Sequence, residues 1–131
     1  MPESIAETAI KGLHIIAELH DCACDAGLMR EVEPLRALCL AACVDAGLSV
    51  VAEAFHGFAG AGATGAVVLA ESHVAVHTWP ELGAVTLDIY VCNFSQDNRA
   101  AAEAAFSAML AAFVPASVVR RDVARGELVA I

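Results

Sequence analysis

Four strand-like segments follow one another in the middle of the sequence, separated only by short turns. They cover residues 49–58, 64–71, 73–79 and 84–92, and are rich in Val, Ile, Thr and aromatic residues. A glycine-rich turn over residues 60–65 separates the first two. Strands grouped in one block, with helices before and after them, are typical of α+β folds with an antiparallel sheet.

Two segments with helical periodicity flank this block. Apolar residues recur at helical spacing over residues 28–46, and Pro34 suits the first turn of that helix. The alanine-rich segment 98–113 has the same spacing, and Gln96 or Asp97 is its candidate cap. The sequence therefore predicts two helices, one on each side of the strand block.

Residues 13–19 and 118–123 complete the pattern as two further strands. We expect one α+β domain over residues 1–131, a two-layer sandwich of a mainly antiparallel sheet with two helices on one face. The other sheet face also has an apolar side to bury, which makes a homodimer physically reasonable.

The charge of the chain disfavours two classes of partner. Sixteen acidic residues against seven basic ones give a formal net charge of -9, which argues against nucleic acid and against an anionic membrane surface. No secretory signal is visible, and the longest uncharged runs contain several glycines or a proline. We therefore expect a soluble, cytoplasmic protein.

Five cysteines without a secretory signal are expected to be reduced thiols rather than a disulfide framework. Cys39 and Cys43 are four residues apart, so both can face the core from one helix. Cys22 and Cys24 lie beside His20, but this C-x-C spacing has no second ligand pair. No metal site is therefore expected.

Residues 69–81, LAESHVAVHTWPE, hold a serine, two histidines, two carboxylates and the only tryptophan. Together with GLHIIAEL near the N-terminus, AFHGF and the strand over residues 88–92, this segment resembles the pyruvoyl-dependent S-adenosylmethionine decarboxylases of the short prokaryotic type. The resemblance covers most of the chain. It implies the two-layer fold and a homodimer of cleaved protomers with active sites close to the dimer interface.

The resemblance implies self-cleavage between Glu71 and Ser72. In this family the serine hydroxyl attacks the preceding carbonyl carbon, the amide becomes an ester, and β-elimination leaves a dehydroalanine that hydrolyses to a pyruvoyl group. The products here would be a beta chain, residues 1–71, and an alpha chain, residues 72–131. Such a reaction needs a strained bond, a donor for the oxyanion and a base.

Three further residues match family positions with a role in catalysis. His77 matches the processing base and lies on a strand that can fold back past Ser72. Without the resemblance, the expected role of His77 would be that of a core histidine. Thr64 stands where the family usually has a serine that assists processing. Cys92 matches the acid that returns a proton to the substrate, and its alternative is a buried structural thiol.

The expected substrate pocket involves Phe58 and Trp79, whose family counterparts hold adenine and the methionyl sulfonium. Without the resemblance, aromatic residues on strands would more often be core residues. Glu81 is a candidate carboxylate for ribose hydroxyls or the substrate's charge, and Glu71 would line the pocket beside the new chain end. Aromatic faces attract a cation by about 0.5–2 kcal/mol and stack on a base.

Decarboxylation of an amino acid needs an electron sink, and the sequence has no phosphate-binding motif and one lysine, Lys11. A pyruvoyl group made from Ser72, which would form a Schiff base with the substrate amine, fits better. We expect an S-adenosylmethionine decarboxylase that serves polyamine (spermidine) synthesis. PELG for the usual PEYG, and the loop FAGAGATG, leave a pyruvoyl-dependent arginine or ornithine decarboxylase as the close alternative. A non-cleaving regulatory or metabolite-binding dimer is the less favoured one.

Overall fold

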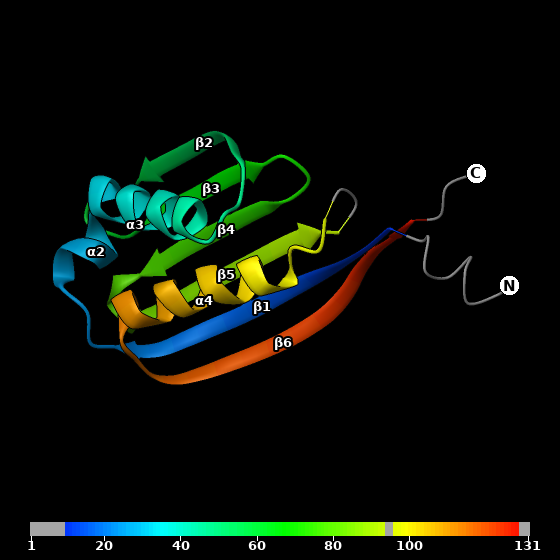
Figure 1. Cartoon of the computed structure of the whole chain (residues 1–131). Helices are drawn as coiled ribbons and strands as arrows, with labels where there is room; N and C mark the ends of the chain where they lie inside the picture. Colours follow the sequence, from blue (N-terminus) through cyan, green and yellow to red (C-terminus); the bar gives the residue numbers. More distant parts are fainter. Residues whose placement is uncertain (1–9, 94–95, 129–131) are drawn as a thin grey trace, which may run out of the picture.

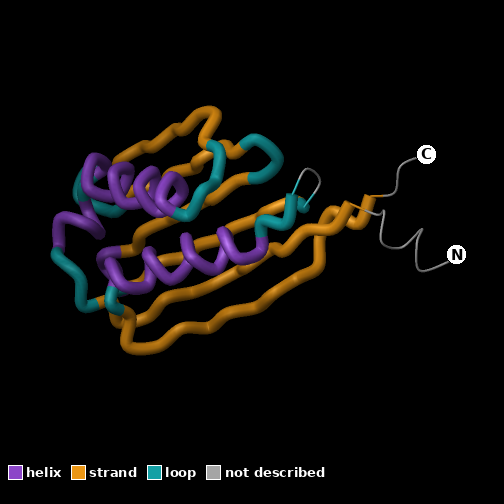
Figure 2. The backbone as a smooth tube through the Cα atoms, viewed as in Figure 1, coloured by secondary structure: helices purple, strands orange, loops and turns teal. Residues whose placement is uncertain are grey.

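The computed structural model describes residues 10–93 and 96–128, and these form an open six-stranded sheet with helices on one face (Figures 1 and 2). The order in the sheet is β2-β3-β4-β5-β1-β6, and every neighbouring pair is antiparallel. The expected α+β sandwich is therefore confirmed. The strands are β1 (Ile10–Cys22), β2 (Val50–Gly57), β3 (Ala63–Leu69), β4 (His73–Trp79), β5 (Ala84–Cys92) and β6 (Pro115–Leu128).

Two longer helices, α3 (Val32–Asp45) and α4 (Arg99–Phe113), lie across the same face of the sheet (Figure 1). A short helix, α2 (Ala26–Arg30), precedes α3, and a 3-10 turn, η1 (Pro80–Leu82), follows β4. None of the described helices is long and apolar enough to cross a membrane.

The prediction of one helix over residues 28–46 is wrong at its start. The backbone of Glu31 is extended (φ -114, ψ 141), so the segment divides into α2 and α3. The physical reason is Pro34, which has no N–H to donate to the carbonyl of Arg30 and whose ring would clash with it in a continuous helix. Pro34 does lie in the first turn of α3, as expected.

The core lies between the helices and one face of the sheet. Strand residues alternate, so in β4 Val74, Val76 and Thr78 are buried under the helices while the side chains between them lie on the other face. We call that other face, which no described helix covers, the open face. The alternation therefore places His73 and His77 on the open face.

Three smaller expectations need correction. The turn predicted over residues 60–65 ends at Gly62, because β3 begins at Ala63 and residues 63–65 pair with β2. The cap position of α4 is Asn98, whose buried side-chain amide donates to the carbonyl oxygen of Cys92. The last strand, β6, is longer than residues 118–123, because it pairs with β1 along most of its length.

Candidate active site

Glu71 and Ser72 lie in the turn that joins β3 to β4, outside the strand ladder. The carbonyl oxygen of Ser72 accepts a hydrogen bond from the backbone N–H of Leu69 at 2.9 Å. Both residues are half-buried, and Oε1 of Glu71 is shielded from solvent without a hydrogen-bond partner among the described residues. A small cavity of about 50 Å³ adjoins the turn. The bond expected to be cleaved is thus held in a tight turn beside a cavity.

Left-handed backbone strain does not occur at this turn. Among the described non-glycine residues, only Asp21 and Val114 have a positive φ. The strain that self-cleavage requires is therefore not stored in the φ angle of Glu71 or Ser72.

Cys92 lies at the same end of the sheet as Ser72. Tyr90 pairs with His73, the residue after Ser72, so Cys92, two residues beyond Tyr90, is level with the turn. The Cys92 side chain is only 8% exposed, and its carbonyl oxygen accepts a 2.9 Å hydrogen bond from the side-chain amide of Asn98. We call Glu71, Ser72, Cys92 and Asn98 the cleavage-end cluster.

His77 lies well away from this cluster in the same chain. It is four residues beyond His73 in a continuous strand, a distance of about 13 Å at about 3.3 Å per residue. The expectation that this strand folds back past Ser72 is wrong, because β4 is paired on one side with β3 and on the other with β5.

His77 contacts Thr64 instead. The two residues are cross-strand neighbours, and the Thr64 hydroxyl lies 3.0 Å from Nδ1 of His77. The next residue, Thr78, is buried, and its hydroxyl accepts from the backbone N–H of Ala63 and donates to the carbonyl oxygen of Met29, both at 2.8 Å. Thr78 thereby fixes the position of the strand that carries His77.

A cavity of about 350 Å³ opens beside His77. Its lining includes all three residues expected to bind substrate, Phe58, Trp79 and Glu81, together with Thr64 and His77. Phe58 and Trp79 are 51% and 43% exposed, so the alternative that they are core residues is wrong. We call these five residues the pocket-end cluster. The predicted site residues therefore form two groups, one at each end of β4.

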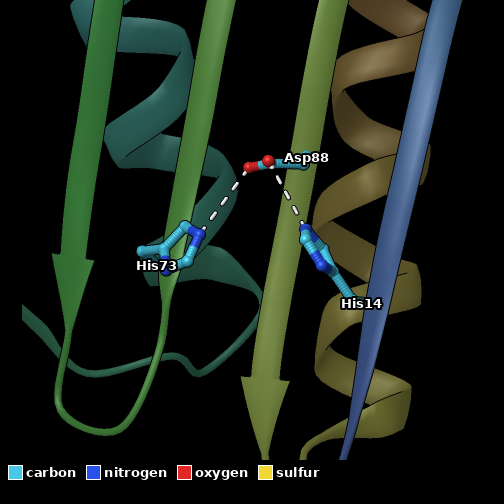
Figure 3. Close-up of side chains that lie close together, drawn as sticks. All are labelled: His14, His73 and Asp88. Carbon is cyan, nitrogen blue, oxygen red and sulfur yellow. Dashed lines mark ion pairs between the residues drawn. The ribbon is translucent and has the colours of Figure 1, made fainter. Parts of the chain in front are cut away.

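A third group was missed by the sequence analysis. His14 from β1, His73 from β4 and Asp88 from β5 meet on the open face (Figure 3). Nε2 of His14 lies 3.4 Å from Oδ2 of Asp88, and Nε2 of His73 lies 3.8 Å from Oδ1 of the same carboxylate. The available signal was the position of these polar residues between buried apolar ones within their strands.

The cysteines of α3 are core residues, as expected. Cys39 and Cys43 are buried, and burial raises the pKa of their thiols to about 12 and about 11. Cys22 and Cys24 are half-buried, and burial also raises their pKa values. The only cluster of three possible metal ligands within residues 10–93 and 96–128 does not include them.

Comparison of the sequence with known proteins places it among S-adenosylmethionine decarboxylases. A family model described as S-adenosylmethionine decarboxylase matches residues 13–126. The S-adenosylmethionine decarboxylase proenzyme of Picrophilus torridus is 38% identical over 115 residues, which cover 88% of this chain and 84% of that protein. The proenzyme of Pelotomaculum thermopropionicum is 40% identical over 81 residues, 62% of this chain and 63% of that protein, so the matched segment spans slightly less than two thirds of that relative.

The fold also matches a solved structure. The crystal structure of the adenosylmethionine decarboxylase from Aquifex aeolicus superposes with a TM-score of 0.79 at 31% sequence identity. The match covers 94% of each chain.

Proposed function

Because this chain belongs to the S-adenosylmethionine decarboxylase family, we propose that it is a self-processing, pyruvoyl-dependent carboxy-lyase that decarboxylates S-adenosylmethionine. The observation that carries the proposal is the position of Ser72 in an unpaired turn beside Glu71 and level with Cys92, in a chain whose relatives are named proenzymes. The product would be an aminopropyl donor for polyamine synthesis, made in the cytoplasm.

In the proposed processing step the Ser72 hydroxyl oxygen attacks the carbonyl carbon of Glu71, and the hydroxyl proton passes through the base to the amide nitrogen of Ser72. The C–N bond breaks to give an ester, and loss of a proton from Cα of residue 72 then expels the Glu71 carboxylate. Hydrolysis of the remaining dehydroalanine releases ammonia and leaves a pyruvoyl group on the chain that starts at residue 72. The steps need a base near Ser72, and a neutral imidazole is well suited to that role.

A homodimer would supply that base. His77 lies about 13 Å along the strand beyond His73 in its own chain, but a partner turned end for end on the open face would bring its pocket-end cluster to the cleavage-end cluster. The open face carries exposed apolar side chains that such a contact would cover. They are Ile16, Val68, Trp79, Val119 and Val123. Each active site would then combine Ser72 and Cys92 of one protomer with Thr64 and His77 of the other.

The cavity at His77 supports a nucleoside substrate with a cationic centre. Phe58 and Trp79 offer aromatic faces for adenine and for the sulfonium, a contact of about 0.5–2 kcal/mol. Trp79 is oriented by a 3.3 Å hydrogen bond from its indole N–H to the hydroxyl of Thr86. Glu81 offers a carboxylate to the ribose hydroxyls or to the positive charge.

The pyruvoyl group would supply the electron sink for the carbanion that forms when carbon dioxide leaves. The chain's own residues would do the rest. Cys92, largely buried beside the turn, would return the proton to the substrate Cα, and the aromatic pair would hold the substrate and exclude water.

The mass of the denatured, purified protein tests the self-processing. We expect two chains that correspond to residues 1–71 and 72–131, the second blocked at its N-terminus and reactive toward carbonyl reagents. A Ser72→Ala variant is the matched control and should give one intact chain. A wild-type protein that stays intact, or a Ser72→Ala variant that is still cleaved at this bond, would contradict the proposal.

The substrate is tested separately on the cleaved protein. Release of carbon dioxide is measured in parallel from S-adenosylmethionine, arginine and ornithine, and we expect turnover of the first. Turnover of arginine or ornithine instead would support the pyruvoyl chemistry but contradict S-adenosylmethionine as the substrate.

A further inference from the structure

The group formed by His14, His73 and Asp88 arises from three neighbouring strands. His14 and His73 are the cross-strand neighbours of Tyr90 on its two sides, in β1 and β4. Asp88 lies two residues before Tyr90 in β5, so its side chain is on the same, open face. Both imidazole rings pack against the Tyr90 ring, with centroids 5.8 and 5.7 Å away, and point toward the carboxylate (Figure 3).

The contacts within this group are not good hydrogen bonds. The nitrogen–oxygen distances of 3.4 and 3.8 Å exceed the usual range of about 2.7–3.2 Å. Nε2 of His14 and Oδ1 of Asp88 are also shielded from solvent and have no hydrogen-bond partner among the described residues. Shielded polar atoms without a partner are rare in proteins, and a bound cation is one arrangement that would satisfy both of these atoms.

We propose that His14, His73 and Asp88 bind a divalent transition-metal ion of the zinc class. Two donors bound to one ion at about 2.0–2.1 Å with tetrahedral angles lie about 3.3–3.5 Å apart. The 3.4 Å between Nε2 of His14 and Oδ2 of Asp88 matches this separation, and the 3.8 Å between Nε2 of His73 and Oδ1, the other oxygen of that carboxylate, is close to it. One donor atom from each of the three side chains lies within 4.8 Å of the others, so a single ion between them needs only small side-chain rotations.

The donor set selects the kind of ion. Two imidazole nitrogens and one carboxylate oxygen suit zinc or a similar first-row ion, whereas magnesium and calcium prefer ligands that are all oxygen. Three protein ligands leave a coordination position open, as in zinc sites that bind water or a further ligand. If Glu71–Ser72 is cleaved as proposed above, the ion would join the two chains, since His14 precedes the cut and the other ligands follow it.

Arg125 determines the tautomer of His14 in the metal-free protein. Its Nη1 lies 3.3 Å from Nδ1 of His14, and its guanidinium stacks on the Tyr90 ring at 4.2 Å. A guanidinium only donates, so in the metal-free protein Nδ1 of His14 accepts and the proton is on Nε2, facing Asp88. Metal binding moves that proton to Nδ1 and displaces the exposed Arg125 contact. The ion therefore competes with the cationic guanidinium of Arg125 for this imidazole.

Cobalt titration of the tag-free, chelator-treated protein tests the site, with the visible d–d absorption of the bound ion as the readout and zinc as the competitor. We expect one ion per protomer in the wild type. His14→Gln and Asp88→Asn should weaken binding by more than about 10–100-fold, the loss typical of removing only a supporting residue. His56→Gln is the matched control, because His56 is exposed on β2 outside the cluster, and it should bind like the wild type.

The readout does not depend on activity, so the site stands or fails independently of the decarboxylase proposal. Absence of saturable binding to the wild type, or unchanged binding by both ligand variants, would overturn it. Circular dichroism checks that the variants fold. If they do not fold, protection of His14 and His73 in the wild type from diethyl pyrocarbonate by zinc decides the question, and equal modification with and without zinc rejects the site.

Discussion

The hydroxyl of Thr64 lies 3.0 Å from Nδ1 of His77, across the hairpin formed by β3 and β4. A serine is usual at this position in the family that the sequence resembles, but the threonine retains the hydroxyl that contacts the imidazole. Its β-branched side chain has fewer rotamers, and the flanking pair of strands holds it opposite His77. The contact orients the imidazole ring, and because a hydroxyl can donate or accept, it is compatible with either tautomer.

Replacement of Thr64 by valine should slow self-cleavage. Valine has nearly the same shape but cannot hydrogen-bond to His77, and loss of a hydrogen bond of about 1.4 kcal/mol corresponds to about tenfold in rate. The measurement is the rate at which the chain of residues 72–131 appears by mass spectrometry. Thr64→Ser is the control and should cleave at the wild-type rate or faster. A Thr64→Val protein that cleaves normally would remove Thr64 from the processing step.

Two inactive variants should complement each other. We expect Ser72→Ala and His77→Ala each to stay uncleaved when expressed alone. In a heterodimer, however, the intact Ser72 of one chain meets the intact His77 of the other, and the His77→Ala chain should then be cleaved. Co-expression with two different affinity tags, followed by mass measurement of each chain, checks this. If the His77→Ala chain stays intact in the mixed dimer, the shared site is wrong.

Loss of the Cys92 thiol should separate processing from turnover. Cys92→Ala should still be cleaved at Glu71–Ser72, whereas carbon dioxide release should fall by about 10²–10⁴-fold, the usual effect of losing a positioned acid. Cys39→Ala is a useful comparison, because Cys39 is also buried but lies on α3. Turnover by Cys92→Ala equal to that of the wild type would exclude the thiol from the mechanism.

The ion pairs of Arg120 should make stability depend on pH. Its guanidinium donates to Oε1 of Glu103 at 2.9 Å and to Oδ1 of Asp122 at 2.7 Å, which lowers the pKa of both carboxyls. Because the pKa is lower in the folded state, this contribution is present above the unfolded pKa values of about 4 and is lost as pH falls through the folded values.

Arg120→Gln should therefore lower the free energy of unfolding at neutral pH by about 1 kcal/mol or less, since the groups are partly exposed. The difference from the wild type should shrink in acid. Urea denaturation at several pH values measures it, and Arg30→Gln, an exposed arginine on α2, is the control. A difference that does not change with pH would contradict the role of the ion pairs.

The thiols should differ in reactivity. Burial raises the pKa of Cys39 to about 12 and that of Cys43 to about 11, so both stay protonated and inaccessible at neutral pH. Iodoacetamide should modify the half-buried Cys22 and Cys24 first, and Cys39 and Cys43 only after unfolding. Peptide mass mapping of native and denatured protein checks this order, and equal labelling of all four in the native state would contradict it.

Local sequence patterns predicted the strands and helices, because the spacing of apolar residues determines which side chains a strand or a helix can bury. Alternation of buried and open-face side chains over residues 73–79 matches β4 residue for residue, and the spacing in residues 98–113 matches α4 to within one residue. The split of the first helix was also accessible, since Pro34 prevents a continuous helix through Glu31. The run ESHVAVHTWPE, together with GLHIIAEL, AFHGF and the strand over residues 88–92, indicated the family and the expected nucleophile.

Only the tertiary structure decided how the site residues are grouped, because strand order and register depend on pairing between distant segments. The pairing of β4 with both β3 and β5 separates His77 from Ser72 in the same chain. The same register brings His14, far away in the sequence, beside His73 and Asp88. Residue types and local periodicity were therefore readable from the sequence, whereas the distances between the reactive groups are set by which strands hydrogen-bond to one another.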